Sequence, residues 1–190
     1  MVQALRFGQL ALLSVLAVVP FAASANELFL DLNSDAAQAR FDATHHSRFD
    51  YSLALLISDE DDFDSTVLSA GMWTKGKALV EDALEGGLGF KLYHIDTDYE
   101  DVQALSLGGN LSFDIKQVEG LRIDLDLYYA PDILITDDLD NLWDMTLRVH
   151  YQLFENGSVY GGFRNLEVGN DGGPDADISD GPIIGIQLSL

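Results

Sequence analysis

Alternation of apolar and polar residues recurs along most of this chain and constrains its fold more than any other feature. Leu121, Ile123 and Leu125 fall on one side of the period, and Arg122 and Asp124, between them, fall on the other. A β-strand turns successive side chains to opposite faces, so such a stretch has one apolar face and one charged face. In a membrane barrel the apolar face meets lipid and the charged face lines the lumen, whereas in a soluble sandwich the apolar face meets a second sheet.

The stretches are roughly 8–13 residues long, close to the ~9–11 residues with which a tilted strand crosses a bilayer. We expect strands at 27–33, 36–44, 48–58, 65–75, 83–94, 102–115, 121–130, 142–154, 158–168 and 182–190. No long stretch shows the 3.6-residue period of a helix. The pattern therefore predicts an all-β fold, an up-and-down antiparallel transmembrane β-barrel of ten strands. Eight strands is the alternative if residues 27–44 do not join the wall.

The first 25 residues form a separate unit. Arg6 precedes an apolar run at 10–21, and Ala23 and Ala25 make an A-x-A cleavage site. The run is shorter than the ~20 residues that a membrane-spanning helix needs. We therefore expect a cleaved signal peptide at 1–25 and one barrel domain at 26–190. The chain has no cysteine, so no disulfide holds the exported domain together.

Acidic residues outnumber basic ones by 32 to 10, which gives a formal net charge of −22. Such a chain would repel nucleic-acid phosphates, and we exclude nucleic-acid binding. The expected connections 58–64, 95–101, 131–141 and 169–181 hold 17 of the acids and no Lys or Arg. Because these long connections alternate with short ones, we expect all four at one end of the barrel. In outer-membrane barrels the longer loops are extracellular.

The polar faces of the expected strands would share the lumen. The charged and titratable side chains that the period turns inward are Arg40, Asp42, Arg48, Asp50, Lys91, Asp114, Arg122, Asp124, Asp126, Asp144, Arg148, His150 and Arg164. Buried charges must pair, so we favour an interlocked network that plugs the lumen over a narrow solute path. Aromatic residues near strand ends are expected to form girdles at the membrane interfaces: Phe49, Tyr51, Tyr129, Trp143 and Tyr151.

The C-terminal stretch alternates again, with Ile184, Ile186, Leu188 and Leu190 on one face. Many outer-membrane barrels end in such a strand, which the assembly machinery reads, usually with a terminal Phe or Trp where this chain has Leu. Together with Asn26–Asn33 directly after the signal peptide, the mature region resembles the YfaZ family of bacterial outer-membrane proteins. The resemblance implies an outer-membrane barrel from a Gram-negative bacterium. It implies no activity and no functional residues.

Candidate metal and catalytic residues are few. Asp171, Asp175 and Asp177 offer the hard oxygen ligands that Ca²⁺ or Mg²⁺ prefers, without the spacing of an EF-hand, and we expect no other cofactor. Ser106 and Ser112 are inward candidates for a nucleophile, but nothing in the sequence pairs either with a histidine. We therefore expect no enzyme activity.

The leading hypothesis is an outer-membrane barrel with a structural or narrow-channel, porin-like role. One alternative is a soluble periplasmic or secreted β-sandwich that binds a ligand, and a second is an outer-membrane barrel enzyme acting on lipid or lipopolysaccharide. The expected partners are outer-membrane lipid and lipopolysaccharide, and the barrel assembly machinery through the C-terminal strand. We expect a monomer. What covers the outer face of the strands decides between barrel and sandwich.

Overall fold

The computed structural model describes most of the chain. The described residues are 26–44, 48–60, 63–74, 76–77, 84–97, 101–136, 139–170 and 176–190. Residues 1–25 lie outside them, so the signal peptide stays a prediction. Among the described residues, no helix is long and apolar enough to cross a bilayer.

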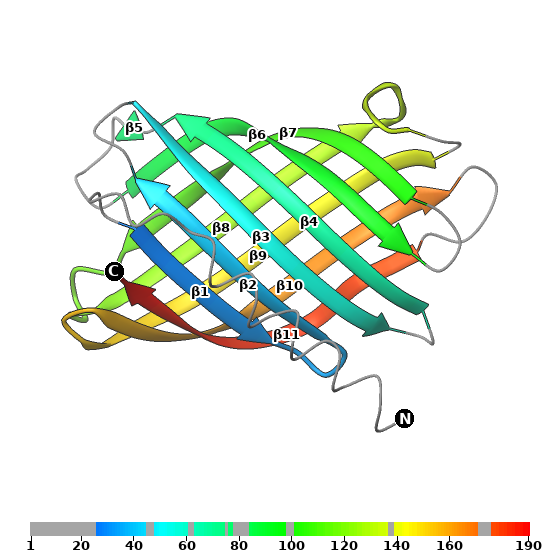
Figure 1. Ribbon diagram of the computed structural model, residues 1–190. Coiled ribbons are helices and arrows are strands. Elements are labelled where there is room, and N and C mark those ends of the chain that lie inside the picture. The colour runs from blue at the N-terminus through cyan, green and yellow to red at the C-terminus, as the bar shows by residue number, and fades with distance from the viewer. Residues whose placement is uncertain are drawn as a thin grey trace.

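The described strands form one antiparallel sheet that closes into a barrel (Figure 1). The long strands of the wall are β1 (Asn26–Leu32), β2 (Ala36–Thr44), β3 (Phe49–Glu60), β4 (Phe63–Thr74), β6 (Leu84–Thr97), β7 (Asp101–Asp114), β8 (Leu121–Pro131), β9 (Leu139–Phe154), β10 (Gly157–Asn170) and β11 (Ala176–Ser189). The short β5 (Gly76–Lys77) pairs with β6 beyond the end of β4, and a 3-10 helix, η1 (Asp132–Leu134), follows β8. Pairing of β1 with β11 and of β4 with β6 completes the closure.

The barrel of ten long strands confirms the predicted fold class. β1 and β2 belong to the wall, because β1 pairs with both β11 and β2, and β2 pairs with β3. The alternative of eight strands is therefore wrong. A single closed sheet also contradicts the β-sandwich, which needs two sheets packed face to face.

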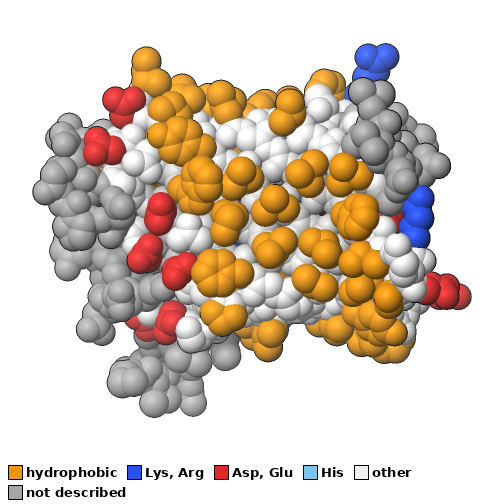
Figure 2. All heavy atoms as spheres, turned by 180° about the vertical axis from the view of Figure 1, so that it is seen from behind, with side chains coloured by type: hydrophobic (Ala, Val, Ile, Leu, Met, Phe, Trp, Pro, Cys, Tyr) orange, Lys and Arg blue, Asp and Glu red, His pale blue; other side chains and the backbone are white. Residues whose placement is uncertain are grey.

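The two ends of the barrel differ in charge. At the end that we call the terminal end, the two termini of the barrel meet, and Leu190 N donates to Asn26 O at 2.9 Å. The connections after β2, β4, β7 and β9 lie at this end, and those after β1, β3, β6, β8 and β10 lie at the other, which we call the acidic end. Figure 2 shows acidic side chains gathered at the acidic end and basic ones at the terminal end.

The strands run further toward the acidic end than the sequence pattern predicts. β3 continues to Glu60, β4 begins at Phe63, and β11 begins at Ala176. The prediction of long loops at 58–64 and 169–181 is therefore wrong over much of their length. The loop predicted at 95–101, between β6 and β7, is also shorter than expected. Alternation of side chains stops where the apolar surroundings stop, whereas the hydrogen bonds between strands continue into water. Several of the acids consequently lie on strand ends.

The outward register agrees with the alternation in the sequence. Leu127 and Leu147 are 38% and 40% exposed, whereas their inward neighbours Asp126 and Thr146 are 8% and 3% exposed. Apolar side chains cover the middle of the wall between the two charged ends (Figure 2). Soluble monomers rarely expose so large a continuous apolar surface, so the outer face of this barrel is suited to lipid.

The interior is layered along the barrel axis. Toward the acidic end the inward side chains form an apolar core, made of Ala36, Leu56, Val67, Tyr93, Ile95, Val102, Ala104, Ala130, Leu142, Leu166, Val168 and Ile178. Ile135 and Leu139 pack against it from the connection after β8 and from the start of β9. The sequence pattern predicts a charged lumen; the structure confines the charges to the middle and the terminal half.

Gly185 of β11 makes room for a large polar side chain of the middle layer. It lies directly opposite Tyr160 of β10 in the strand register. A Cβ atom at position 185 would overlap the ring and hydroxyl of Tyr160. The absence of a side chain there lets the Tyr160 ring lie across the lumen, where it is almost fully buried.

Candidate functional site: the charged lumen

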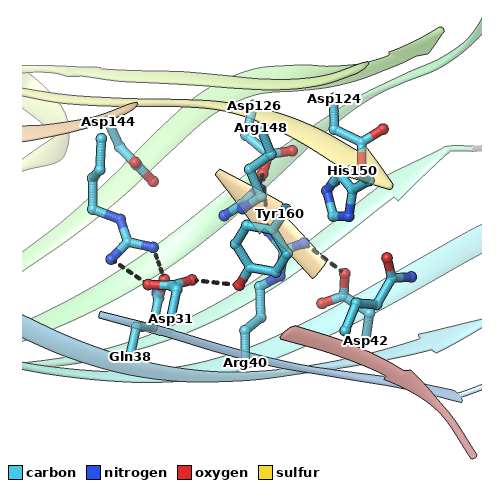
Figure 3. A network of polar contacts seen from close by, with 12 residues as sticks. Asp31, Gln38, Arg40, Asp42, Asp124, Asp126, Asp144, Arg148, His150 and Tyr160 are labelled. Atoms are coloured by element: carbon cyan, nitrogen blue, oxygen red, sulfur yellow. Dashed lines mark hydrogen bonds and ion pairs between the residues drawn. The ribbon is translucent and has the colours of Figure 1, made fainter. Parts of the chain in front are cut away.

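Asp126 of β8 is the centre of the ion-pair network in the lumen. Its Oδ2 accepts hydrogen bonds from Arg40 Nη1 at 2.9 Å and from Arg148 Nη1 at 2.7 Å. Arg40 also pairs with Asp42, with 3.3 Å between Nη2 and Oδ2. The Arg40 guanidinium lies over the ring of Phe29, 4.1 Å from its centroid. Side chains from β2, β8 and β9 thus meet inside the barrel, as Figure 3 shows.

A second group joins β10 to β1 and β2. Arg164 Nη1 lies 2.9 Å from Asp31 Oδ1, and Tyr160 Oη donates to Asp31 Oδ2 at 2.9 Å (Figure 3). Arg164 also donates to the side-chain oxygen of Gln38. Asp31 and Arg164 are only 2% and 3% exposed, so their charges are shielded from water and depend on each other.

A third group crosses the lumen between β6 and β9. Lys91 Nζ lies 3.0 Å from Asp144 Oδ2, and Tyr93 Oη donates to the same oxygen. Lys91 Nζ is also 4.2 Å from the centroid of the Tyr128 ring, within range of a cation–π contact. Because β6 and β9 do not pair in the sheet, this ion pair spans the interior rather than the wall.

A fourth group lies nearest to the terminal end. Asp124 Oδ2 is 3.0 Å from Arg122 Nη2 and 3.1 Å from His150 Nε2. The other ring nitrogen of His150, Nδ1, is 3.4 Å from Ser158 Oγ. Gln187 Oε1 accepts hydrogen bonds from Ser158 Oγ and Arg122 Nη2, each at 3.0 Å. Polar contacts therefore run without interruption across β8, β9, β10 and β11.

Free space inside the barrel narrows from the terminal end inward. One cavity of about 400 Å³ extends from Glu27 and Glu85 to Arg40 and Arg148. A second, of about 340 Å³, lies beside the fourth group. Next to the apolar core the free volume is about 20 Å³, among side chains that include Asp144. The ion pairs and the apolar core together close the lumen toward the acidic end.

Most of the lumen charges predicted from the sequence face inward, but two do not join the network. Arg48 precedes β3 and Asp114 ends β7, and both side chains are exposed at the terminal end. The two-residue period places them on the inward face, but they lie where the wall stops and water begins. Asp50 is buried and lines the larger cavity.

The sequence interpretation missed Asp31 as a lumen residue. Its signal was present, because Leu28 and Leu30 alternate with Phe29 and Asp31 in β1. Most inward aromatic side chains were missed as well, because an aromatic residue on the polar face gives no periodic signal. Tyr93 and Tyr160 were missed in this way, whereas the two-residue period placed Tyr128 on the charged face. All three lie against the lumen charges.

The predicted interfacial aromatic residues point outward. Phe49, Tyr51 and Tyr151 are exposed near the terminal end of the wall. Tyr129 and Trp143 lie near the acidic end, directly opposite each other in the register, with ring centroids 6.1 Å apart. Their outward position at both ends of the apolar belt is that of interfacial girdles.

The metal prediction is not settled by the structure. The described residues include no group of three or more His, Asp or Glu that would hold a metal ion. Asp171 and Asp175 lie outside the described residues, and Asp177 is in β11. Binding of Ca²⁺ or Mg²⁺ at the acidic end stays a prediction.

A closed antiparallel barrel with an apolar outer belt, outward aromatic residues at both ends of that belt and a charged interior is an outer-membrane-type β-barrel. The model of one protein family, described as YfaZ precursor, matches residues 5–190. The chain belongs to the YfaZ family, which confirms the resemblance seen in its sequence. A search of curated proteins finds no match.

Solved structures of outer-membrane proteins are similar to this chain in architecture. A bacterial polysaccharide outer membrane secretin is 11% identical, with a TM-score of 0.49, over 82% of this chain and 55% of that one. The KdgM porin is 10% identical, with a TM-score of 0.43, over 88% and 99%. The outer membrane protease OmpT from Escherichia coli is 7% identical, with a TM-score of 0.47, over 87% and 93%. The chain spans about half the length of the secretin, and nothing about ligands or activity carries over at such identities.

Proposed function

We propose that this chain is a closed barrel of the outer membrane of a Gram-negative bacterium, exported by its signal peptide, with a structural role. The acidic end faces outward, toward lipopolysaccharide, and the terminal end faces the periplasm. The apolar belt between the two ends supports membrane insertion. The C-terminal strand β11 is the element that the assembly machinery would recognise, and the chain acts as a monomer in lipid.

The layering of the interior is the observation that supports a closed barrel. From the terminal end a solute would meet the Arg40–Asp126–Arg148 ion pairs and then the apolar core. The free volume between them, about 20 Å³, is near the minimum that one water molecule needs. A narrow porin-like path would need both layers to rearrange, so the structural role is the better supported of the two.

Ionic current through single barrels in a planar bilayer tests this proposal. The wild type, folded into lipid as shown by heat-modifiable gel mobility, should give no stable current steps. A variant with Leu56→Ala, Leu142→Ala and Leu166→Ala removes three large side chains of the apolar core and should leak, because the remaining ion pairs no longer fill the cross-section. A stable conductance of the wild type that the triple variant leaves unchanged would contradict the closed barrel.

A further inference from the structure

The fourth polar group has the register of a catalytic relay on three consecutive strands. His150 of β9 lies opposite Arg122 of β8 and opposite Tyr160 of β10. Asp124 and Ser158 are the diagonal neighbours of His150, one on each flanking strand, and diagonal positions of an antiparallel sheet lie within reach of long side chains. Asp124 is on the side of the acidic end, and Ser158 is on the side of the terminal end.

The contacts of His150 define which of its nitrogens faces the serine as an acceptor. Asp124 Oδ2 lies 3.1 Å from Nε2, at ion-pair distance but without the in-line geometry of a hydrogen bond. Its negative charge favours the tautomer with the proton on Nε2. Nδ1 then presents a lone pair toward Ser158 Oγ, 3.4 Å away. The Tyr160 ring, 4.7 Å from the imidazole centroid, and Phe29, 6.2 Å away and edge-on, hold the ring in this orientation. Ser158 donates its single hydroxyl proton to Gln187 Oε1 in this structure, so the hydroxyl must turn toward Nδ1 before the relay forms. Catalytic hydrogen bonds of unliganded enzymes are often long and shorten when substrate binds.

An oxygen already occupies the place that a substrate carbonyl oxygen would take. Gln187 Oε1 is 3.0 Å from Ser158 Oγ and 3.0 Å from Arg122 Nη2. A nucleophilic site needs one position about 3 Å from both the nucleophile and a donor that stabilises an oxyanion. The Gln187 amide marks that position, and its flexible side chain must swing aside before a substrate enters.

The 340 Å³ cavity gives this group access to the terminal end. Ser158, His150, Arg122 and Gln187 all line it, together with the turn between β7 and β8. Its volume suits a small acyl group with a short alcohol part and is at the low end for ligand sites. The remaining charged residues of its lining are mostly acidic: Glu27, Asp114, Lys116, Glu119 and Glu155. This balance favours neutral or cationic substrates over anionic ones.

The geometry points to a serine acyl hydrolase site at the periplasmic mouth of the barrel, with small carboxylic esters as its substrate class. Ser158 Oγ attacks the ester carbonyl carbon while its proton passes to His150 Nδ1, and the Arg122 guanidinium stabilises the oxyanion. The bond to the alcohol oxygen breaks, and the alcohol leaves with that proton. Water then attacks the acyl-serine and gives a proton to His150, which returns it to Ser158 Oγ as the carboxylic acid leaves. Asp124 is a positioning residue.

The chemistry of this site does not depend on the proposed closed barrel, whereas its periplasmic position rests on the proposed orientation. The cavity lies on the terminal side of the ion pairs around Asp126, so a sealed lumen leaves it accessible from the periplasm. The sequence-based expectation of no enzyme considered Ser106 and Ser112. Ser106 is fully buried and donates to the Lys91 carbonyl, so it cannot serve as a nucleophile. Ser158 was missed because its partner lies on the neighbouring strand.

Covalent labelling of the full-length mature protein, folded in lipid, tests the site. A fluorophosphonate reacts with an activated serine oxygen to form an O–P bond with loss of fluoride, and ordinary serines do not react. We expect one adduct per chain, which peptide mass spectrometry places on Ser158. The matched control is Ser189→Ala, because Ser189 lines the same cavity without belonging to the relay and its loss should leave the labelling rate unchanged.

Variants of His150, Asp124 and Ser158 show whether the contacts among these residues serve catalysis or only the structure. His150→Gln should slow labelling of Ser158 by at least ~100-fold, because a general base contributes about 10²–10⁴-fold. Asp124→Asn should slow it by a smaller factor, and Ser158→Cys should restore a reactive nucleophile toward a thiol-directed alkylating reagent. Each variant is scored only on the fraction with the heat-modifiable mobility of the folded barrel.

Hydrolysis of p-nitrophenyl acetate, compared with p-nitrophenyl palmitate, gives the second readout. The short ester should turn over and the long one should not, since the cavity is too small for a long acyl chain. Absence of any adduct on Ser158 in the folded wild type would overturn the proposal. So would an adduct that forms equally fast in His150→Gln, because Ser158 would then be reactive without its base.

Discussion

Removing the charge of Asp126 is the sharpest test of how the lumen is held together. Asp126→Asn keeps the shape of the side chain and one oxygen acceptor but removes the negative charge that two arginines share. Arg148 is 2% exposed and pairs with Asp126 at 2.7 Å, so its guanidinium would lose its ion-pair partner inside the barrel. Arg40 retains its contact with Asp42 at 3.3 Å.

The expected loss of stability follows from the charge of Arg148 that Asp126 no longer balances. Breaking a buried ion pair by removing one partner costs about 3–5 kcal/mol, because the other charge stays desolvated. The asparagine oxygen still accepts one hydrogen bond, which is worth about 1 kcal/mol. We therefore expect Asp126→Asn to lower the free energy of unfolding by about 2–4 kcal/mol. Asp140→Asn, at an exposed position of β9, should change it by less than about 0.5 kcal/mol.

A second substitution tests whether the unpaired charge of Arg148 causes this loss of stability. In Asp126→Asn with Arg148→Met, the unpaired cation is gone and an unbranched apolar side chain fills its space. The double variant should be more stable than the sum of the two single losses, with an interaction energy within the ~0.5–3 kcal/mol range found for contacting pairs. The free energies come from urea unfolding in lipid vesicles, followed by the fluorescence of Trp73 and Trp143. Additive losses, or an Asp126→Asn variant as stable as wild type, would refute the role given to this carboxylate.

Three further predictions concern the wall, the interior packing and the orientation. Leu147→Arg at the middle of β9 should cost roughly 2–4 kcal/mol in lipid, and Leu147→Ala less, because only the arginine places a charge at the bilayer midplane; equal losses in urea unfolding would reject the outward register. Gly185→Ala should destabilise the barrel by about 1–3 kcal/mol, because the new methyl group overlaps the buried Tyr160 ring. Gly161→Ala is the control: the nearest atom to its Cβ is 3.9 Å away, so it should be close to neutral in the same assay. Epitope tags inserted at 171–175 should be labelled by antibody on intact cells and tags at 116–120 only after permeabilisation; the reverse pattern would invert the proposed orientation.

The strand pattern was predictable because lipid and lumen impose opposite demands on alternate residues. Leu125 and Asp126 are neighbours in β8, yet one faces the outside and the other is the centre of the ion-pair network. A two-residue period records this difference directly. Strand ends were not predictable in the same way, because beyond the apolar belt both faces of a strand meet water and the period carries no information.

The apolar core of the acidic half was missed although the sequence held a signal for it. Residues 53–57 of β3 are apolar without interruption, which is typical of a strand buried on both faces. Leu53 is exposed on the outside, whereas Leu56 is buried in the core. The partners within the lumen could not be predicted at all. Asp31 and Arg164 come from opposite ends of the chain, and only the closure of β1 on β11 brings them together.

The order of the layers limits where this barrel can bind anything polar. In the half toward the acidic end, the described wall is apolar outside and packed with apolar side chains inside, which separates the lumen charges from that end. The charged side chains of the middle layer pair with one another, although Arg40 Nε, Asp42 Oδ1 and Arg148 Nε have no hydrogen-bond partner. Among the described residues, the cavities of the terminal half combine free volume with polar side chains, including His150 and Ser158. A ligand that uses the lumen therefore has to enter from the terminal end, which in the proposed orientation is the periplasm.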